Sequence, residues 1–179
     1  MKLVAIVGSL RKDSYNRGLV ETIKERFVQK FELEILEIGQ LPHYNQDDEF
    51  NPSEPVLEFK RKVKEADGVI IITPEFNWSI PGVLKNALDW LSRVDKVLIG
   101  KPVMTGGATM GIAGTLRAQL HIREILASLQ AKLLPPAGNE ILISQAHTKF
   151  DEETGLLKEE ATLKFVDDVV ERFVAFVKE

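Results

Sequence analysis

The sequence predicts an α/β fold in which five parallel strands alternate with helices to form a three-layer sandwich. Two apolar runs, LVAIV at 3–7 and GVIIIT at 68–73, are continuous rather than alternating. Such runs are typical of strands that are covered on both faces of a parallel sheet. The chain has 179 residues, of which 44% are hydrophobic, and this is enough for one compact unit with a buried core. We therefore expect residues 1–179 to form a single domain.

The remaining elements follow from weaker apolar runs and from helical periodicity. The other expected strands are LEILEIG at 33–39, KPVMTG at 101–106 and NEILIS at 139–144. The last helix is predicted by apolar residues at helical spacing, namely Val166, Val169, Val170, Phe173, Val174 and Val177. The helix before it shows the same spacing at Ile122, Ile125, Leu126 and Leu129. In such folds a ligand binds outside the carboxyl ends of the strands, so we expect a site in the loops after the first, third and fourth strands.

Composition excludes several classes of function. The formal net charge of -4 and the even spread of Lys and Arg argue against nucleic-acid binding. The chain contains no cysteine, which excludes disulfides and thiolate chemistry. The apolar run in MKLVAIVGSLRKD is too short for a signal peptide or a membrane span, so a cytoplasmic location is expected. The three histidines are scattered with no metal or triad spacing, and no metal site and no catalytic side chain are predicted.

The loop after the first strand, GSLRKDSYN at 8–16, has the composition of an anion site. Ser9, Ser14 and Asn16 offer neutral donors, Arg11 offers a charged one, and the next helix begins here. Neither the P-loop nor the dinucleotide glycine pattern is present, which favours a terminal monophosphate over a pyrophosphate. The alternative is that Ser14 only caps the helix and that Arg11 is solvated.

Two further loops have unusual compositions. TPEFNWSIPG at 73–82 contains Pro74, which ends a strand, and Pro81, which suits a first helical turn. TGGATMGIAG at 105–114 is dense in glycine, which indicates either backbone close to a flat ligand or a flexible loop.

Together, GSLRKDSYN, PEFNWSIPGVLKNALDW and GGATMGIAGTLRAQLHIREIL resemble the NAD(P)H-dependent FMN reductases, a flavodoxin-like family that includes quinone, azo-dye and chromate reductases. The resemblance implies a sheet of order 2-1-3-4-5, noncovalently bound FMN, and NADPH or NADH as cosubstrate. It also implies a homodimer or homotetramer with the flavin near a subunit interface.

The resemblance extends to single residues. It implies that Ser9, Arg11, Ser14 and Asn16 bind the phosphate. It implies that Pro74, Glu75, Phe76 and Asn77 form a cofactor-binding loop, and that Thr109 and Gly111 belong to the segment that meets the pyrimidine end of the ring. The chain departs from the family pattern at Phe76, usually tyrosine, at Asp13, often glycine, and at Thr115, usually glycine. We expect the Asp13 carboxylate to face water, because it would repel a phosphate.

These observations predict an FMN-dependent oxidoreductase that passes two electrons from NAD(P)H to quinones, azo compounds or similar small acceptors, by a ping-pong scheme. A flavodoxin-type one-electron carrier without nicotinamide activity is the alternative, and Arg11 argues against it. A non-enzymatic module would need a degraded phosphate loop. Trp78 and Trp90 fit either an interface or the core. The loop 39–53, with Tyr44 and Phe50, fits an interface or a gate.

Overall fold

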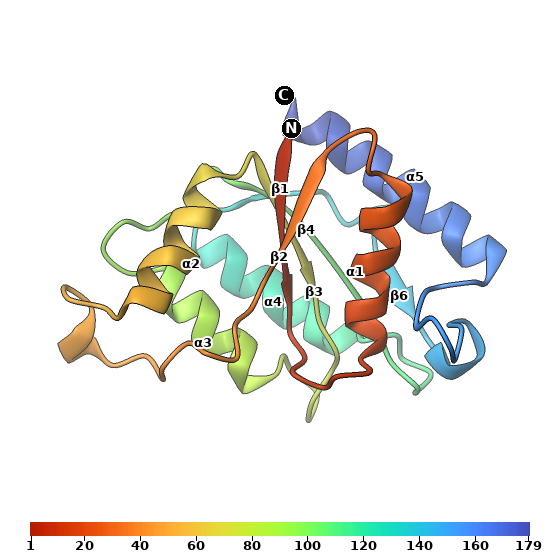
Figure 1. Ribbon diagram of the computed structural model, residues 1–179, viewed down its shortest axis with the longest axis horizontal. Helices are drawn as coiled ribbons and strands as arrows, with labels where there is room; N and C mark the ends of the chain where they lie inside the picture. The colour runs from red at the N-terminus through yellow and green to blue at the C-terminus, as the bar shows by residue number, and fades with distance from the viewer.

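The computed structural model describes residues 1–179. The chain forms one parallel sheet with helices on both of its faces (Figure 1). The strands are β1 (Lys2–Val7), β2 (Glu32–Leu36), β3 (Gly68–Ile72), β4 (Pro102–Ala108), β5 (Lys132–Leu133) and β6 (Ile141–Ile143). The helices are α1 (Tyr15–Arg26), α2 (Glu54–Glu65), α3 (Gly82–Leu91), α4 (Leu116–Ser128) and α5 (Glu160–Val177). Two short 3-10 turns lie at Gln46–Asp48 and Ala146–Thr148.

The strand order is β2-β1-β3-β4-β5, with β6 also paired to β4, and every pairing is parallel. The flavodoxin-like order 2-1-3-4-5 is therefore confirmed, and its fifth position is divided between two short strands. β5 pairs with the start of β4 and β6 with its end. The interruption follows from Pro135 and Pro136, which cannot donate to a ladder, and from Gly138, whose φ of 77° turns the chain. The predicted strand at 139–144 is β6, and β5 was not predicted.

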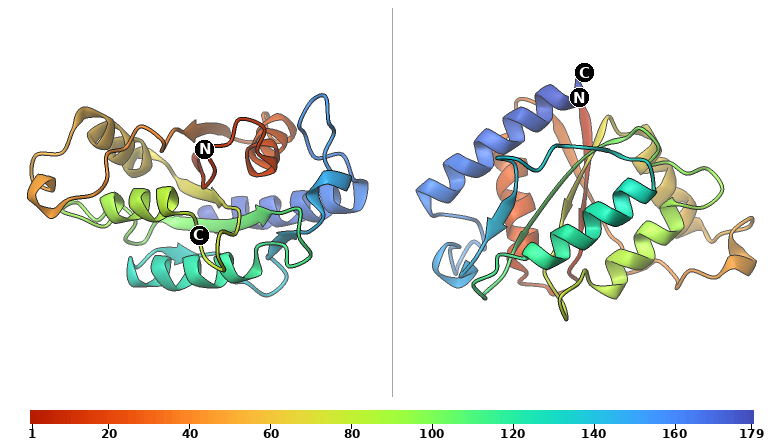
Figure 2. Two further views of the ribbon diagram at one scale, coloured as in Figure 1. Left: turned by 90° about the horizontal axis from the view of Figure 1, so that it is seen from below. Right: turned by 180° about the vertical axis from the view of Figure 1, so that it is seen from behind.

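The continuous apolar runs arise because β1 and β3 contribute to two cores at once. In β1, Leu3, Ala5 and Val7 pack with α1 and α5, whereas Val4 and Ile6 pack on the other face with α2, α3 and α4. Figure 2 shows the two groups of helices on opposite sides of the sheet. Burying both faces of each central strand removes water from the sheet and fixes the positions at which its loops leave. None of the helices has the length and apolar character needed to cross a bilayer.

The loop 39–53, here called the arm, projects from the sheet between β2 and α2 (Figures 1 and 2). Its base is fixed on α3, because the Pro42 carbonyl accepts from Asn86 Nδ2 (3.0 Å) and from Trp90 Nε1 (2.8 Å). Trp90 is 2% exposed and is therefore a core residue. At the tip, the Phe50 side chain is 82% exposed. The arm thus has a rigid base and a solvent-facing tip.

Candidate functional site

The loops after β1, β3 and β4 meet at one edge of the sheet, at the bottom of Figure 1, as the fold class predicts. We call this the carboxyl edge. Backbone hydrogen bonds hold the three strand ends in register, from the Gly8 amide to the Ile72 carbonyl (2.8 Å) and from the Thr73 amide to the Gly106 carbonyl (3.0 Å). Gly8 has no room for a side chain, since a Cβ there would lie 2.6 Å from Thr73 Oγ1. The first and second loops are therefore packed directly together.

In the loop after β1, Ser9 is half-buried and Arg11 is exposed. The Ser9 hydroxyl accepts from the Arg11 amide (3.3 Å), and Arg11 Nε donates to the Asp13 carbonyl (3.0 Å). The Arg11 guanidinium also lies 5.5 Å from the centre of the Tyr15 ring. Asp13 is exposed, as expected for a carboxylate beside an anion site. Arg11 is thus held by a backbone carbonyl and a ring, with no acidic partner.

The N-terminus of α1 has the features of an anion-binding helix end. Ser14 occupies the N-cap, is buried, and makes no side-chain capping bond to its own helix. The first turn of α1 contains no acidic residue. No acid within the first turn therefore offsets the positive end of the helix dipole, the exposed Asp13 lies before the N-cap, and the first amides are not capped by Ser14. This arrangement favours the anion-binding interpretation of Ser14 over simple capping.

Asn16 is only 3% exposed and holds the first and third loops together. Its Nδ2 donates to the Ala108 carbonyl (2.9 Å), and its Oδ1 accepts from the Ala108 amide (2.8 Å). Both ends of the side-chain amide are thus bonded to the end of β4. In this structure Asn16 positions the loops, and its contact with a cofactor stays a prediction, because Nδ2 keeps a second hydrogen.

The loop after β3 contains a tight turn in an uncommon conformation. Phe76 and Ser79 exchange backbone hydrogen bonds of 2.9 and 3.0 Å, and the central residues Asn77 and Trp78 have φ of 51° and 65°. Two positive φ values define a type I′ turn, which glycine or asparagine usually occupies. A tryptophan there is a backbone outlier of the kind found at functional sites. Phe76 is exposed and Trp78 is 69% exposed, so the turn presents aromatic side chains to solvent.

Glu75, in the same loop, reaches the N-terminus of α4. Its Oε2 accepts from the amides of Arg117 (2.9 Å) and Ala118 (3.2 Å), and its Oε1 lies 3.4 Å from Arg117 Nη1. The Arg117 guanidinium in turn lies 4.6 Å from the centre of the Trp78 ring. The loop after β3 and the start of α4 are therefore joined by charged hydrogen bonds and by a cation–π contact.

The glycines after β4 have different roles. A Cβ on Gly106 would lie 2.9 Å from that of Ile141, and one on Gly107 would lie 2.2 Å from the Thr73 carbonyl oxygen. These two glycines serve packing within the sheet. Gly111 faces open space, with only Thr109 Oγ1 within 4 Å of an added Cβ. The open space around Gly111 is compatible both with close approach of a ligand and with a flexible loop, so its contact with a ligand stays a prediction.

Thr115, one of the departures that the resemblance indicated, is fully buried with φ of 69°. Its hydroxyl accepts from Gln119 Nε2 (3.2 Å), which also donates to the Ile141 carbonyl (2.8 Å). Thr115 thus adopts the left-handed conformation that favours glycine, and its hydroxyl has a buried hydrogen-bond partner.

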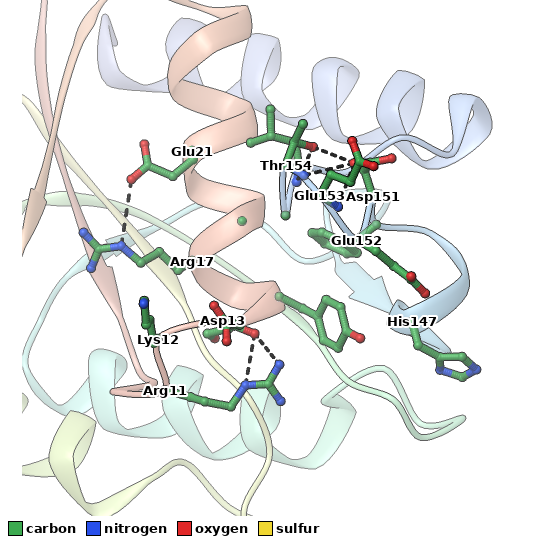
Figure 3. Close-up of a pocket in the computed structure, with 16 residues that line it drawn as sticks. Arg11, Lys12, Asp13, Arg17, Glu21, His147, Asp151, Glu152, Glu153 and Thr154 are labelled. Atoms are coloured by element: carbon green, nitrogen blue, oxygen red, sulfur yellow. Dashed lines mark hydrogen bonds and ion pairs between the residues drawn. The ribbon is translucent and has the colours of Figure 1, made fainter.

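A hollow of about 550 Å³ flanks the first loop, between α1 and the segment before α5 (Figure 3). It includes Arg11 and Ser14 but no residue from the other two loops. Its far wall is residues 147–156, where Thr154 donates backbone and side-chain hydrogen bonds that lower the pKa of the Asp151 carboxyl. Sequence reasoning did not assign this wall a role. The sequence feature that indicates this wall is DEETG at 151–155, a compact turn. The residues on either side of it, Phe150 and Leu157, form an isolated β-bridge.

Comparison with known proteins identifies the family. A sequence profile for NADPH-dependent FMN reductase matches residues 1–148. The chain is 42% identical over 185 residues to an NADH-dependent flavin reductase subunit 2 of Lactobacillus johnsonii, covering 100% of this chain and 98% of that protein. It is 35% identical over 182 residues to a quinone reductase of Escherichia coli (strain K12), covering 99% and 96%.

A solved structure agrees with these relatives. The flavoenzyme NAD(P)H:(acceptor) oxidoreductase of Paracoccus denitrificans superposes with a TM-score of 0.90 and 34% identity, covering 99% of this chain and 97% of that one. The family predicted from the three motifs is thereby confirmed, and with it an oxidoreductase that uses FMN and NAD(P)H. The chain belongs to the family of NADPH-dependent FMN reductases.

Proposed function

We propose that the carboxyl edge binds FMN and that the protein uses it to reduce quinones, azo compounds or similar small acceptors with NAD(P)H. The observation that supports this most directly is the N-terminus of α1. It is uncapped by Ser14 and free of acids in its first turn, and it lies beside Ser9 and Arg11, whose guanidinium has no acidic side chain as partner. A helix end with neutral hydroxyls and one arginine fits a phosphate monoester. We extend the proposal to the whole of residues 1–179 as one FMN-binding domain.

The residues divide into two groups under this proposal. Ser9, Arg11 and Ser14 bind the phosphate, and Asn16 holds that loop on the end of β4. The ring lies between the two remaining loops, whose proposed contacts are Pro74, Glu75, Phe76, Asn77, Thr109 and Gly111. When bound, FMN accepts two electrons from NAD(P)H and passes them to the second substrate. The protein supplies binding, orientation and access.

The exposed apolar side chains at the carboxyl edge suit flat aromatic acceptors. Phe76, Trp78, Met110 and Ile112 are all exposed there, and planar rings stack on such surfaces. The relatives include a quinone reductase of Escherichia coli (strain K12) and a 2-hydroxy-1,4-benzoquinone reductase of a Burkholderia species. An open edge lets NAD(P)H and acceptor occupy the same space in turn, which gives ping-pong kinetics. NAD(P)H is a cytoplasmic metabolite, and we propose that location for the protein.

A visible spectrum followed by an anaerobic reduction tests the proposal. The purified protein, or the protein incubated with FMN, should show bound flavin, and heat should release FMN rather than FAD. NADH or NADPH should then bleach the flavin fully, and a benzoquinone should restore its colour promptly. A protein that stays colourless with FMN overturns the proposal. Flavin that neither nucleotide bleaches would instead indicate the one-electron carrier.

We also propose a homodimer or homotetramer that uses the carboxyl edge. Trp78 and Leu120 are exposed side chains on the adjoining loop and helix α4, and exposed apolar side chains that gather on one face often mark an interface. Light scattering at micromolar concentration should report at least twice the mass of one chain. A monomer would refute this assembly without affecting the proposed chemistry.

A further inference from the structure

The N-terminus of α4 obtains its cap from a distant residue. The N-cap, Thr115, is left-handed and makes no side-chain capping bond, because its hydroxyl is bonded to Gln119. The first turn of α4 contains no acidic residue. The capping bonds come instead from Glu75, which lies 42 positions earlier and accepts from two first-turn amides. The positive end of the helix dipole stabilises a carboxylate at this position.

The Glu75 carboxylate is also well shielded. Its side chain is 13% exposed, and its only basic partner, Arg117, is 47% exposed. The negative charge thus lies inside the edge while the guanidinium lies toward solvent over Trp78. Water and salt screen the more buried Glu75 charge less than the exposed Arg117 charge. On the inner side of this ion pair, the electrostatic potential is therefore set mainly by Glu75.

We infer that Glu75 offsets the positive end of α4 and thereby keeps the reduction potential of bound FMN low. The inference rests on the proposed function, which places the ring between the loop that contains Glu75 and the loop that leads into α4. Reduced FMN is more electron-rich than oxidised FMN, so a neighbouring negative charge weakens binding of the reduced form more. A low potential makes the reduced enzyme a stronger reductant toward its acceptor. Glu75 acts here as a positioning and tuning residue.

Two substitutions separate the effect of the Glu75 charge from the effect of its hydrogen bonds to the first turn of α4. Glu75→Gln keeps an acceptor oxygen at the same reach but removes the charge, which leaves Arg117 and the α4 terminus unbalanced. Glu75→Asp keeps the charge but is one methylene shorter, so it cannot reach the Arg117 and Ala118 amides. Glu124→Gln, an exposed acid further along α4, is the matched control.

The first measurement is the midpoint potential of FMN-loaded protein by spectroelectrochemical titration. We expect Glu75→Gln to favour the reduced form about tenfold, which is about 30 mV for a two-electron couple. Glu75→Asp and Glu124→Gln should stay close to wild type. An unchanged potential in Glu75→Gln, or equal rises in Glu75→Gln and Glu75→Asp, overturns the inference.

The second measurement uses flavin-free protein and amide hydrogen exchange. The Arg117 and Ala118 amides should exchange faster in Glu75→Asp and remain protected in Glu75→Gln. Unchanged protection in Glu75→Asp would show that Glu75 does not cap α4, and this overturns the inference even if FMN binds as proposed. Failure of wild-type protein to bind FMN would overturn the proposed function and the tuning role, while the exchange data would still report on the cap.

Discussion

Replacing Asn16 by alanine should destabilise the protein in the absence of any flavin. The change removes both hydrogen bonds that the side chain makes with the Ala108 backbone, at a position 3% exposed. A buried polar group left without a partner costs about 1–3 kcal/mol. For the amide and carbonyl of Ala108 together, with water entering part of the space, we expect a loss of about 2–4 kcal/mol in the free energy of unfolding.

The assay is urea unfolding of flavin-free protein, followed by circular dichroism, with a thermal melt beside it. A loss of this size should lower the melting temperature by roughly 5–15 °C in a chain of this length. Asn16→Asp should not rescue stability, because it places a second oxygen 2.9 Å from the Ala108 carbonyl. Arg11→Ala is the control, since Arg11 is exposed in the same loop and should change stability by less than about 0.5 kcal/mol.

The reasoning would be refuted by an Asn16→Ala protein that is as stable as wild type but binds FMN as poorly as Arg11→Ala. That result would mean that the Asn16 side chain turns away from Ala108 and contacts the ligand. The two variants therefore distinguish a residue that builds the site from one that binds in it.

Three further predictions concern binding, pH and packing. Arg11→Ala should weaken FMN binding about 10- to 150-fold, because a charged hydrogen bond is lost, and leave riboflavin binding unchanged in a fluorescence titration; equal losses would place Arg11 away from the phosphate. The hydrogen bond from Arg61 lowers the pKa of Glu58 from 4.5 to about 2, so its contribution to stability is complete above pH 4.5 and is lost as the pH falls through about 2; an NMR titration midpoint near 4.5 would contradict this. Gly18→Ala should lower the melting temperature, because the added Cβ would lie 2.0 Å from the Gly155 carbonyl oxygen. Gly82→Ala should not lower it, because nothing lies within 4 Å of the added Cβ. Equal melting temperatures for the two variants would show that the segment around Gly155 moves to make room.

The sequence was most informative where a single physical requirement determines the residue type. A strand buried on both faces must be apolar throughout, so 3–7 and 68–73 were recognised directly. The last helix was equally clear, because its apolar spacing matches its buried face. The division of the edge strand was not predicted, since a two-residue strand such as β5 has no period to detect.

At the site, the sequence located the three loops but not the partners of their side chains. Asn16 bonds to a backbone 92 positions away, and Glu75 caps a helix 42 positions away. Neither contact leaves a local pattern, because any polar residue in a loop looks equally free to meet a ligand. The sequence around Trp90 fits an interface and the core equally for the same reason, and its burial beside Pro42 shows that it is a core residue. The direct FMN contacts remain predictions.

The arm has a consequence for how this protein can diversify. Because α3 fixes the arm at Pro42 and Tyr44 while Phe50 stands in solvent, the residues between Tyr44 and Phe50 can change in length and identity without disturbing either core. Insertions at such tips cost little, since the entropy of closing a loop grows slowly with its length. New acceptor or partner preferences could thus arise by exchanging the arm's tip alone, with the flavin chemistry inherited intact.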